Sequence, residues 1–454
     1  MPDGAAAGKE QAENSARGRL AAMLAVALPM ILANLTLPLM ALTGTMIAGH
    51  FDNPAELAGV TLGASFVTMI YMLFTFLRMS ATAVVAQADG ADDMELVRDT
   101  FVRMTLLAVV LGLVLAAPSG LWVPMLLPFF GSGPDVELKA MQYIGIRLLS
   151  APAALAGVIA AGYLLGRRRA ISALVLQAAA NLINICCALL LVYGLSGGVD
   201  GIAWAAVVAE YAGIALALLL IAGAGFPEAP PLSLRRLIDH RHLLRLGYLG
   251  RDLLIRSLAL LVSQFLMTRF SAIQGTTILA ANAILLHLHT LVGYAIDGFA
   301  YATQALVGAA IGARDLRRLR ETARAAFELA GVTAFAFALV FLLGGREIVV
   351  LLTSHQDIAG MAIRYMPWLI LLPFVTLWSY IFDGLFIGST RVREARDTTL
   401  LSVAAFAILV FPAYRLLGND GLWGSFALLM ALRGMLLARI WAGLSWEERL
   451  TSGR

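Results

Sequence analysis

Charged residues are scarce in this chain of 454 residues. Asp, Glu, Lys and Arg together make up 14% of it, whereas an ordinary globular protein contains about 25%. Hydrophobic residues make up 60%, and the mean hydropathy is +0.84. A soluble chain of this length would not have such a composition. We therefore predict a polytopic membrane protein embedded in a lipid bilayer.

Lysine and cysteine are also rare. Lys9 and Lys139 are the two lysines, so the net charge of +4 comes almost wholly from arginine. Most arginines fall in loops between apolar runs, as membrane topology requires, so this topology rather than a nucleic-acid partner accounts for the basic charge, and we expect no nucleic-acid partner. The two cysteines, Cys186 and Cys187, are adjacent inside an apolar run. Such a pair indicates neither a disulfide framework nor a metal site, and we expect none.

Motifs of enzymes and ATPases are missing. The chain has no GxxxxGK[ST] loop and no HExxH helix, and its loops are too short to hold a separate catalytic domain. We therefore expect no enzyme activity, no cofactor and no ATP drive. The polar residues 1–18 have mixed charge, which is typical of a short tail rather than of a cleaved signal peptide.

Apolar runs of about 20 residues or more, each long enough to span a bilayer as a helix, follow one another along the chain. We predict twelve, at 20–48, 57–86, 100–128, 137–164, 170–195, 199–224, 246–270, 277–310, 320–344, 361–388, 398–417 and 420–443. Arginines gather in every second loop, and the intervening loops carry few. By the positive-inside rule, both termini face the cytoplasm. We expect a multi-pass protein of the cell inner (plasma) membrane.

The longest polar connection, 226–245, divides the chain into two halves of six spans. A constant shift in residue number relates the halves, for it superposes Thr68 on Thr290, Gly90–Asp93 on Gly312–Asp315, Tyr143 on Tyr365, Gly162 on Gly384 and Gly166 on Gly388. With six spans each, the halves have the same orientation and form parallel repeats. We predict an all-α membrane protein of two six-helix lobes related by a pseudo-two-fold axis.

The predicted domain boundaries follow from these runs. They comprise a cytoplasmic tail at 1–19, an N-lobe at 20–225, an inter-lobe loop at 226–245, a C-lobe at 246–445 and a C-terminal tail at 446–454. Two like-oriented bundles that face each other across a cavity are typical of transporters that work by alternating access.

Several segments of both halves resemble the multidrug and toxic compound extrusion (MATE) family, and within it the DinF-type branch. In the first half they are 26–40, 48–64 and 76–93, and in the second 251–261, 279–286, 294–315 and 383–397. The resemblance covers 20–445. It implies twelve helices in two lobes and efflux of drug-like compounds driven by inward H⁺ or Na⁺. Pro29 matches a proline at which the first helix of the family bends.

The first half departs from the family pattern at its cation site. The family's site has four side chains: an aspartate, an asparagine, a second aspartate and a hydroxyl. This chain has Gly44, Asn184, Ala188 and Ala206 at these places, so the asparagine alone remains. A hard cation such as Na⁺ needs a carboxylate among its oxygen ligands, and an amide does not ionise. We therefore interpret the first-lobe site as vestigial and expect coupling to H⁺ rather than to Na⁺.

Asp297 lies in the middle of the apolar segment 279–315, and Thr75 occupies the matching place in the first half. A buried carboxylate is costly in a membrane, and burial favours its protonated form. We predict that Asp297 is the coupling residue. The alternative is a structural ion pair, for instance with Arg256.

Two other acids are embedded in apolar runs. Glu210 is a further candidate for proton coupling, or else the partner of Arg78 or Arg147. Asp383 lies nearer the cytoplasmic end of its run and is the third candidate. Arg78 is expected to face the bundle interior, either as an ion-pair partner or as a substrate contact.

Polar residues of the second half are candidates for the wall of a substrate cavity. They are Thr290, Tyr301 and Gln304, on the helical face of Asp297, together with Asn282 and Gln264. The alternative is that they bond helices to one another. We expect a monomer that exports amphipathic, cationic drug-like compounds in exchange for H⁺. The alternative is a relative that moves lipid-linked or other metabolites with Na⁺ or altered coupling.

Overall fold

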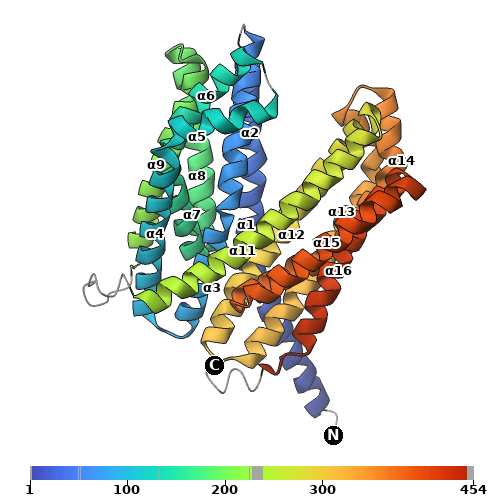
Figure 1. Ribbon diagram of the computed structural model, residues 1–454. Helices are drawn as coiled ribbons and strands as arrows, with labels where there is room; N and C mark the ends of the chain where they lie inside the picture. The colour runs from blue at the N-terminus through green and yellow to red at the C-terminus, as the bar shows by residue number, and fades with distance from the viewer. Residues whose placement is uncertain are drawn as a thin grey trace. The chain divides into compact units, whose positions relative to one another are not determined.

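A computed structural model describes residues 3–49, 51, 53–131, 133–223, 225–226 and 239–446. These residues form helices and loops, with no strand among them. The first half contains α1 (Asp3–Ala48), α2 (Pro54–Leu73), α3 (Thr75–Gly90), α4 (Met94–Ala116), α5 (Ser119–Leu126), η1 (Leu127–Phe130), α6 (Pro134–Leu148), α7 (Ala151–Gly166), α8 (Ala170–Leu189), η2 (Leu190–Gly194) and α9 (Gly198–Gly223). The second half contains α11 (His240–Ile273), α12 (Thr276–Gly312), α13 (Leu316–Leu352), α14 (Gln356–Gly388), α15 (Val392–Leu417) and α16 (Asn419–Ala442) (Figure 1). Most of the predicted inter-lobe loop, and all of the predicted C-terminal tail after 446, lie outside the described residues.

The all-α membrane fold is confirmed. Among the described residues, eleven helices are long and apolar enough to cross a membrane, or twelve if the bent pair α6 and α7 is one span. The predicted third span, 100–128, was too long, because α4 ends at Ala116 and the separate helix α5 begins at Ser119. Pro118 lies between them, and a proline removes a backbone donor and ends a helix.

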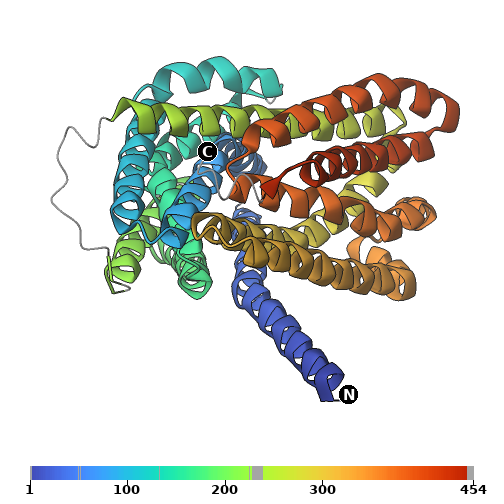
Figure 2. The same ribbon diagram turned by 90° about the horizontal axis from the view of Figure 1, so that it is seen from below.

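The chain forms two compact units. Unit 1 comprises Met1–Ile31 and Gly247–Arg454, and unit 2 comprises Leu32–Leu246. Both α1 and α11 therefore contribute residues to each unit. Within unit 1, α12 packs against α13 and α14, and α16 packs against α14 and α15, so that these helices run alongside one another (Figure 2). The predicted lobe boundaries stay a prediction.

Matching glycines give the two halves the same helix packing. A Cβ atom on Gly162 would lie 2.8 Å from the backbone oxygen of Arg78, and one on Gly384 would lie 2.5 Å from that of Ala300. The two members of each matching pair are related by the shift that the sequence shows. One turn later, Gly166 and Gly388 approach the backbone oxygens of the matching residues 82 and 304 in the same way. The glycines allow α7 to lie directly on α3, and α14 directly on α12.

Loop conformations repeat with the same shift. Asp92 and Arg314 have φ of 59° and 55°, and Arg168 and Thr390 have φ of 59° and 57°. Non-glycine residues rarely adopt this left-handed conformation, so its recurrence at matching positions reflects a common backbone. The N-terminal caps match as well, because Asp93 accepts from the amide of Leu96 as Asp315 does from that of Arg318. Sequence and backbone thus show the same repeat.

Two spans differ between the halves. The first half builds 54–90 from α2 and α3, interrupted at Phe74, and builds 134–166 from α6 and α7 with a bend of 54°. The matching residues 276–312 and 356–388 are the single helices α12 and α14. Pro152 lies in the first turn of α7, where a proline cannot donate to the preceding turn. Gly112 accommodates it, since a Cβ there would overlap the backbone of Pro152.

Candidate functional site

The embedded charges of unit 1 lie where α11, α12, α14 and α16 converge. Asp383 immediately precedes Gly384, so the close contact between α12 and α14 fixes its position on α14. Gly298 immediately follows Asp297, and the first part of α1 packs against it. A Cβ atom on Gly298 would overlap the Cγ1 atom of Ile31. Both aspartates therefore lie beside a glycine at a helix crossing.

Asp383 is held by two arginines. Arg256 of α11 and Arg433 of α16 both donate to its Oδ2 atom. All three residues are buried, with exposures of 6%, 7% and 3% for Arg256, Asp383 and Arg433. Asp383 Oδ1 and the two arginine Nε atoms have no hydrogen-bond partner among the described residues. The three buried charges thus form one ion-pair cluster that links α11, α14 and α16.

Asp297 lies in a different setting on α12. It is half-buried, and it interacts electrostatically with Tyr294 and with Tyr380 of α14. Tyr380 also interacts with Asp383, Arg433 and Tyr301, so it links both aspartates in one electrostatic neighbourhood. The Tyr380 hydroxyl lies 3.2 Å from the position of a Cβ on Gly293, one turn before Asp297. Tyr380 and Arg433 were missed in the sequence. Tyr380 carries no pattern that singles it out, whereas Arg433 could have been found as an arginine embedded in the predicted span 420–443.

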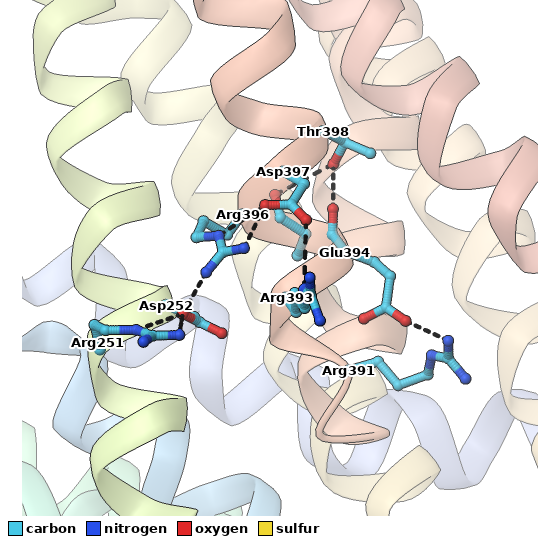
Figure 3. A network of polar contacts seen from close by, with 9 residues as sticks. Arg251, Asp252, Arg391, Arg393, Glu394, Arg396, Asp397 and Thr398 are labelled. Carbon is cyan, nitrogen blue, oxygen red and sulfur yellow. Dashed lines mark hydrogen bonds and ion pairs between the residues drawn. The ribbon is translucent and has the colours of Figure 1, made fainter.

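A second charge network joins the first half of α11 to the start of α15 (Figure 3). Asp252 accepts from Arg251 Nη2 at 2.8 Å and from Arg396 Nη1 at 2.7 Å. Arg396 also donates to Asp397, and Arg391 donates to Glu394. Asp252 is buried, whereas the side chains of Arg251 and Asp397 are 54% and 52% exposed. This network holds two helices together at the predicted cytoplasmic surface.

The other predicted cavity residues are placed differently from one another. Gln304 is buried and Tyr301 is half-buried, whereas Thr290 and Gln264 are exposed. The Thr290 hydroxyl donates to the carbonyl of Leu286 on its own helix at 2.8 Å. Arg78 of α3 is half-buried. Their contact with a substrate stays a prediction.

Asn282 belongs to a fully buried polar network of α11, α12 and α16. Its amide nitrogen donates to Ser271 at 2.8 Å and to Asn419 at 2.7 Å. Its oxygen accepts from Asn419 at 3.0 Å and from the Trp423 indole at 2.9 Å. These four bonds use every hydrogen-bonding group of the amide. We therefore propose that Asn282 bonds helices, which was the alternative to a cavity role.

Glu210 of α9 pairs with Arg147 of α6, at 3.1 Å between Oε1 and Nη2. This is one of the two partners that the sequence suggested. Arg147 also contacts Ser150, at the bend between α6 and α7, and the ring of Tyr71. Unit 2 thus contains an ion pair at the middle of its spans.

The predicted vestigial cation site lies on α1, α8 and α9 of unit 2. Asn184, Ala188 and Ala206 are buried and Gly44 is half-buried. Nearby on α8, Asn181 donates to the Thr36 hydroxyl at 2.6 Å and accepts from Gln177 at 3.1 Å. This amide cluster was not predicted, although Asn181 lies one helical turn before Asn184.

Pro29 lies inside α1, which is a single helix from Asp3 to Ala48. A proline within a helix removes a backbone donor and favours a bend at its position. A bend of this helix at Pro29 during transport stays a prediction.

The chain matches the model of the MatE family over residues 29–190 and 253–413. The chain belongs to the MATE family. DNA damage-inducible protein F of Escherichia coli is 39% identical over 418 residues, which cover 92% of this chain and 90% of that protein. A probable multidrug resistance protein NorM of Pseudomonas putida is 27% identical, with 96% of each chain covered. This MATE protein is therefore a multi-pass membrane transporter of the DinF type and not an enzyme.

Solved structures agree on the fold. A MATE structure in the bent conformation matches with a TM-score of 0.84 at 20% identity, covering 97% of each chain. A eukaryotic MATE transporter matches with a TM-score of 0.80 at 15% identity, covering 97% of this chain and 99% of that one. At these identities the likeness concerns the fold alone, which is the helical MATE architecture predicted from the sequence.

Proposed function

We propose that this MATE transporter is an antiporter of the inner membrane that exports amphipathic, cationic drug-like compounds in exchange for H⁺. The names of relatives that extrude drugs and toxins support the substrate class. A monomer with both termini in the cytoplasm, working by alternating access between its halves, is part of this proposal.

One observation carries the assignment of coupling to Asp297. The two embedded aspartates of unit 1 share a neighbour in Tyr380, yet Asp383 is buried and both Arg256 and Arg433 donate to it. Asp297 is half-buried on α12, beside the contact of Gly298 with α1. A coupling carboxylate must be reachable by protons and must change its charge during the cycle. Asp297 meets both requirements better than Asp383.

Proton coupling also agrees with the first half. The residues at the family's cation site here are Gly44, Asn184, Ala188 and Ala206, which include no group that titrates. A Na⁺ ion bound there would lack a carboxylate ligand. The driving ion would therefore act at carboxylates elsewhere in the chain.

Proteoliposomes with an imposed pH gradient test the proposal, with a fluorescent lipophilic cation such as ethidium as the substrate. We expect wild-type transport to follow the pH gradient and the variant Asp297→Asn to lose this dependence. The matched control is Asp357→Asn, an exposed aspartate in the first turn of α14. Transport that is equal without a pH gradient, or that requires Na⁺, would overturn the proposed coupling.

A further inference from the structure

Three polar side chains of unit 2 meet at the two interruptions of its spans. Tyr71 lies near the end of α2, just before the interruption at Phe74. Arg147 lies in the last turn of α6, just before the bend into α7. Glu210 lies in the middle of α9. In transporters, interrupted helices near the bilayer midplane are where ions and substrates bind.

The contacts within this centre are specific. Arg147 Nη2 donates to Glu210 at 3.1 Å, and Nη1 donates to Ser150 Oγ at 2.5 Å. The guanidinium carbon lies 5.4 Å from the centroid of the Tyr71 ring. Side-chain exposure is 8% for Arg147 and 29% for Glu210. The guanidinium is thus sealed in the helix bundle, while the carboxylate remains accessible.

Tyr211, the residue after Glu210 on α9, also contacts the bend between α6 and α7. The Tyr211 hydroxyl donates to the carbonyl of Leu149 at 3.1 Å, next to the Arg147–Glu210 pair. Ser150 Oγ in turn donates to the carbonyl of Arg147 at 2.8 Å. These bonds satisfy carbonyl groups at the end of α6. Loss of the ion pair would therefore weaken the hold of α9 on the bend.

The second half has no such centre at the matching position. The repeat aligns Arg147 with Leu369, which lies within the continuous helix α14. Leu369 is buried, as is the neighbouring Met366. The charged centre and the helix interruptions therefore occur together, in the half that lacks the family's acidic residues.

Few other titratable groups surround Glu210. Tyr71 and Tyr143 lie within electrostatic range of Arg147. The helices α7 and α8, which pack against α9, contain no Asp, Glu, Lys or Arg. The remaining titratable groups lie on α9 and on the described elements packed against it. They are Asp135, Glu137 and Lys139 in the first two turns of α6, Tyr163 of α7, Cys186 and Cys187 of α8, Tyr193 of η2, and Asp200 and Tyr211 of α9. Among the charges on these elements, Arg147 is the one that Glu210 contacts.

We propose that Glu210 is a second proton-binding residue of transport. Arg147 is its counter-ion while Glu210 is ionised and loses this partner when Glu210 binds a proton. This inference rests on the proposed proton-driven antiport. A proton from the periplasmic side binds the Glu210 carboxylate, and the charge of the pair changes from zero to +1. The uncompensated guanidinium then repels a cationic substrate. Loss of the ion pair also weakens the contact of α9 with the bend between α6 and α7. Deprotonation toward the cytoplasm restores the pair, so Glu210 carries one proton inward in each cycle.

Hydrogen–deuterium exchange on the purified full-length protein tests the inference without any transport. The peptide of interest covers 145–155, and its exchange is measured from mildly acidic to mildly basic pH and corrected for intrinsic exchange. We expect faster exchange at acidic pH in the wild type. Glu210→Gln should exchange fast at every pH, and Glu210→Asp should keep the pH response. The wild-type response in Glu210→Gln, or no pH response in the wild type, would overturn the inference.

Glu56 provides a matched control. It pairs with Lys139 at 3.0 Å in the same unit, and its side chain is 25% exposed, close to the value for Glu210. Glu56→Gln should behave as the wild type. In proteoliposomes, Glu210→Gln should lose gradient-driven export and should bind the cationic substrate more weakly than the wild type, because Arg147 then stays without its counter-ion. If the wild type shows no proton-driven transport, the proposed function fails, while the hydrogen-exchange result still decides the role of Glu210.

Discussion

Asp297 and Asp383 show how the surroundings of a carboxylate decide its role within one helix bundle. Asp383 is buried, and an unpaired buried charge is very costly, so Arg256 and Arg433 stabilise it and it in turn stabilises them. Asp297 is less buried and has tyrosines among its electrostatic neighbours. We therefore expect Asp383 to serve mainly stability and Asp297 mainly transport.

The variant Asp383→Asn tests this division. It leaves two buried arginines without a charged partner, and breaking a buried pair costs about 3–5 kcal/mol. Thermal unfolding of the purified protein should begin at a distinctly lower temperature than in the wild type. Asp297→Asn should unfold near the wild-type temperature and lose only the response to a pH gradient. The reverse pattern would assign the structural role to Asp297.

A second residue-scale prediction concerns Asn282. Replacement by alanine leaves the buried groups of Asn419 and Trp423 without their partner, and each such group costs about 1–3 kcal/mol. We expect a lower unfolding temperature, with unchanged substrate affinity in the protein that remains folded. Gln264→Ala, at an exposed position on α11, is the control and should leave the unfolding temperature unchanged. A loss of affinity without loss of stability in Asn282→Ala would restore its cavity role.

At the scale of helices, glycines set the distances on which the site depends. Gly384 and Gly388 bring α14 onto α12, and Gly298 brings α1 onto the same helix beside Asp297. Helices that pack through small residues approach closely, and van der Waals contact then holds them in the membrane. The position of α1 relative to Asp297 therefore depends on the absence of a side chain at Gly298.

Gly298→Ala should separate these helices. The new methyl group would overlap Ile31 Cγ1 and lie 3.1 Å from the carbonyl oxygen of Ala27, so α1 must move. We expect transport to fall strongly while the protein still inserts and purifies, since overpacking of this kind costs about 1–3 kcal/mol. Gly331→Ala in α13, where nothing lies within 4 Å, is the control. Equal transport by both variants would show that the contact of α1 with α12 is not needed.

For the whole molecule, the sequence was sufficient to predict the helical architecture and the repeat. Run length specifies helices in a bilayer, and the shift between the halves recurs in the glycine contacts and in the left-handed loop residues. Asp383 and Glu210 were also recognised as embedded acids. Hydropathy along one chain is enough for the helices and the embedded acids, because these depend on local composition, and comparison of the two halves is enough for the repeat.

The partners of those acids depend on how distant helices pack, which one sequence does not show. Arg433 lies 50 residues from Asp383, and nothing in the sequence of α16 shows that the two residues pair. The interruption at Phe74 was equally hidden, because its flanking residues form one continuous apolar run. In both cases tertiary packing, rather than local sequence preference, decides the structure.

The distribution of arginines makes a prediction for the membrane orientation of the whole chain. Arginine-rich loops should face the cytoplasm, so residue 393 at the start of α15 should be cytoplasmic and residue 355 before α14 periplasmic. Both positions are exposed. Single cysteines are introduced as Arg393→Cys and His355→Cys into a Cys186→Ser, Cys187→Ser background. Intact cells are then treated with a membrane-impermeant maleimide.

We expect the cysteine at position 355 to react in intact cells, and the one at position 393 to react only after the membrane is permeabilised. The cysteine-free background shows the level of nonspecific labelling, and permeabilised cells show that both positions are reactive. We expect this result because loops rich in arginine stay on the cytoplasmic side during insertion, while the apolar segments cross the bilayer. Labelling at position 393 in intact cells would reverse the orientation. Protons driven inward would then reach Asp297 from the side of the arginine-rich loops, and the proposed direction of export would have to be reversed as well.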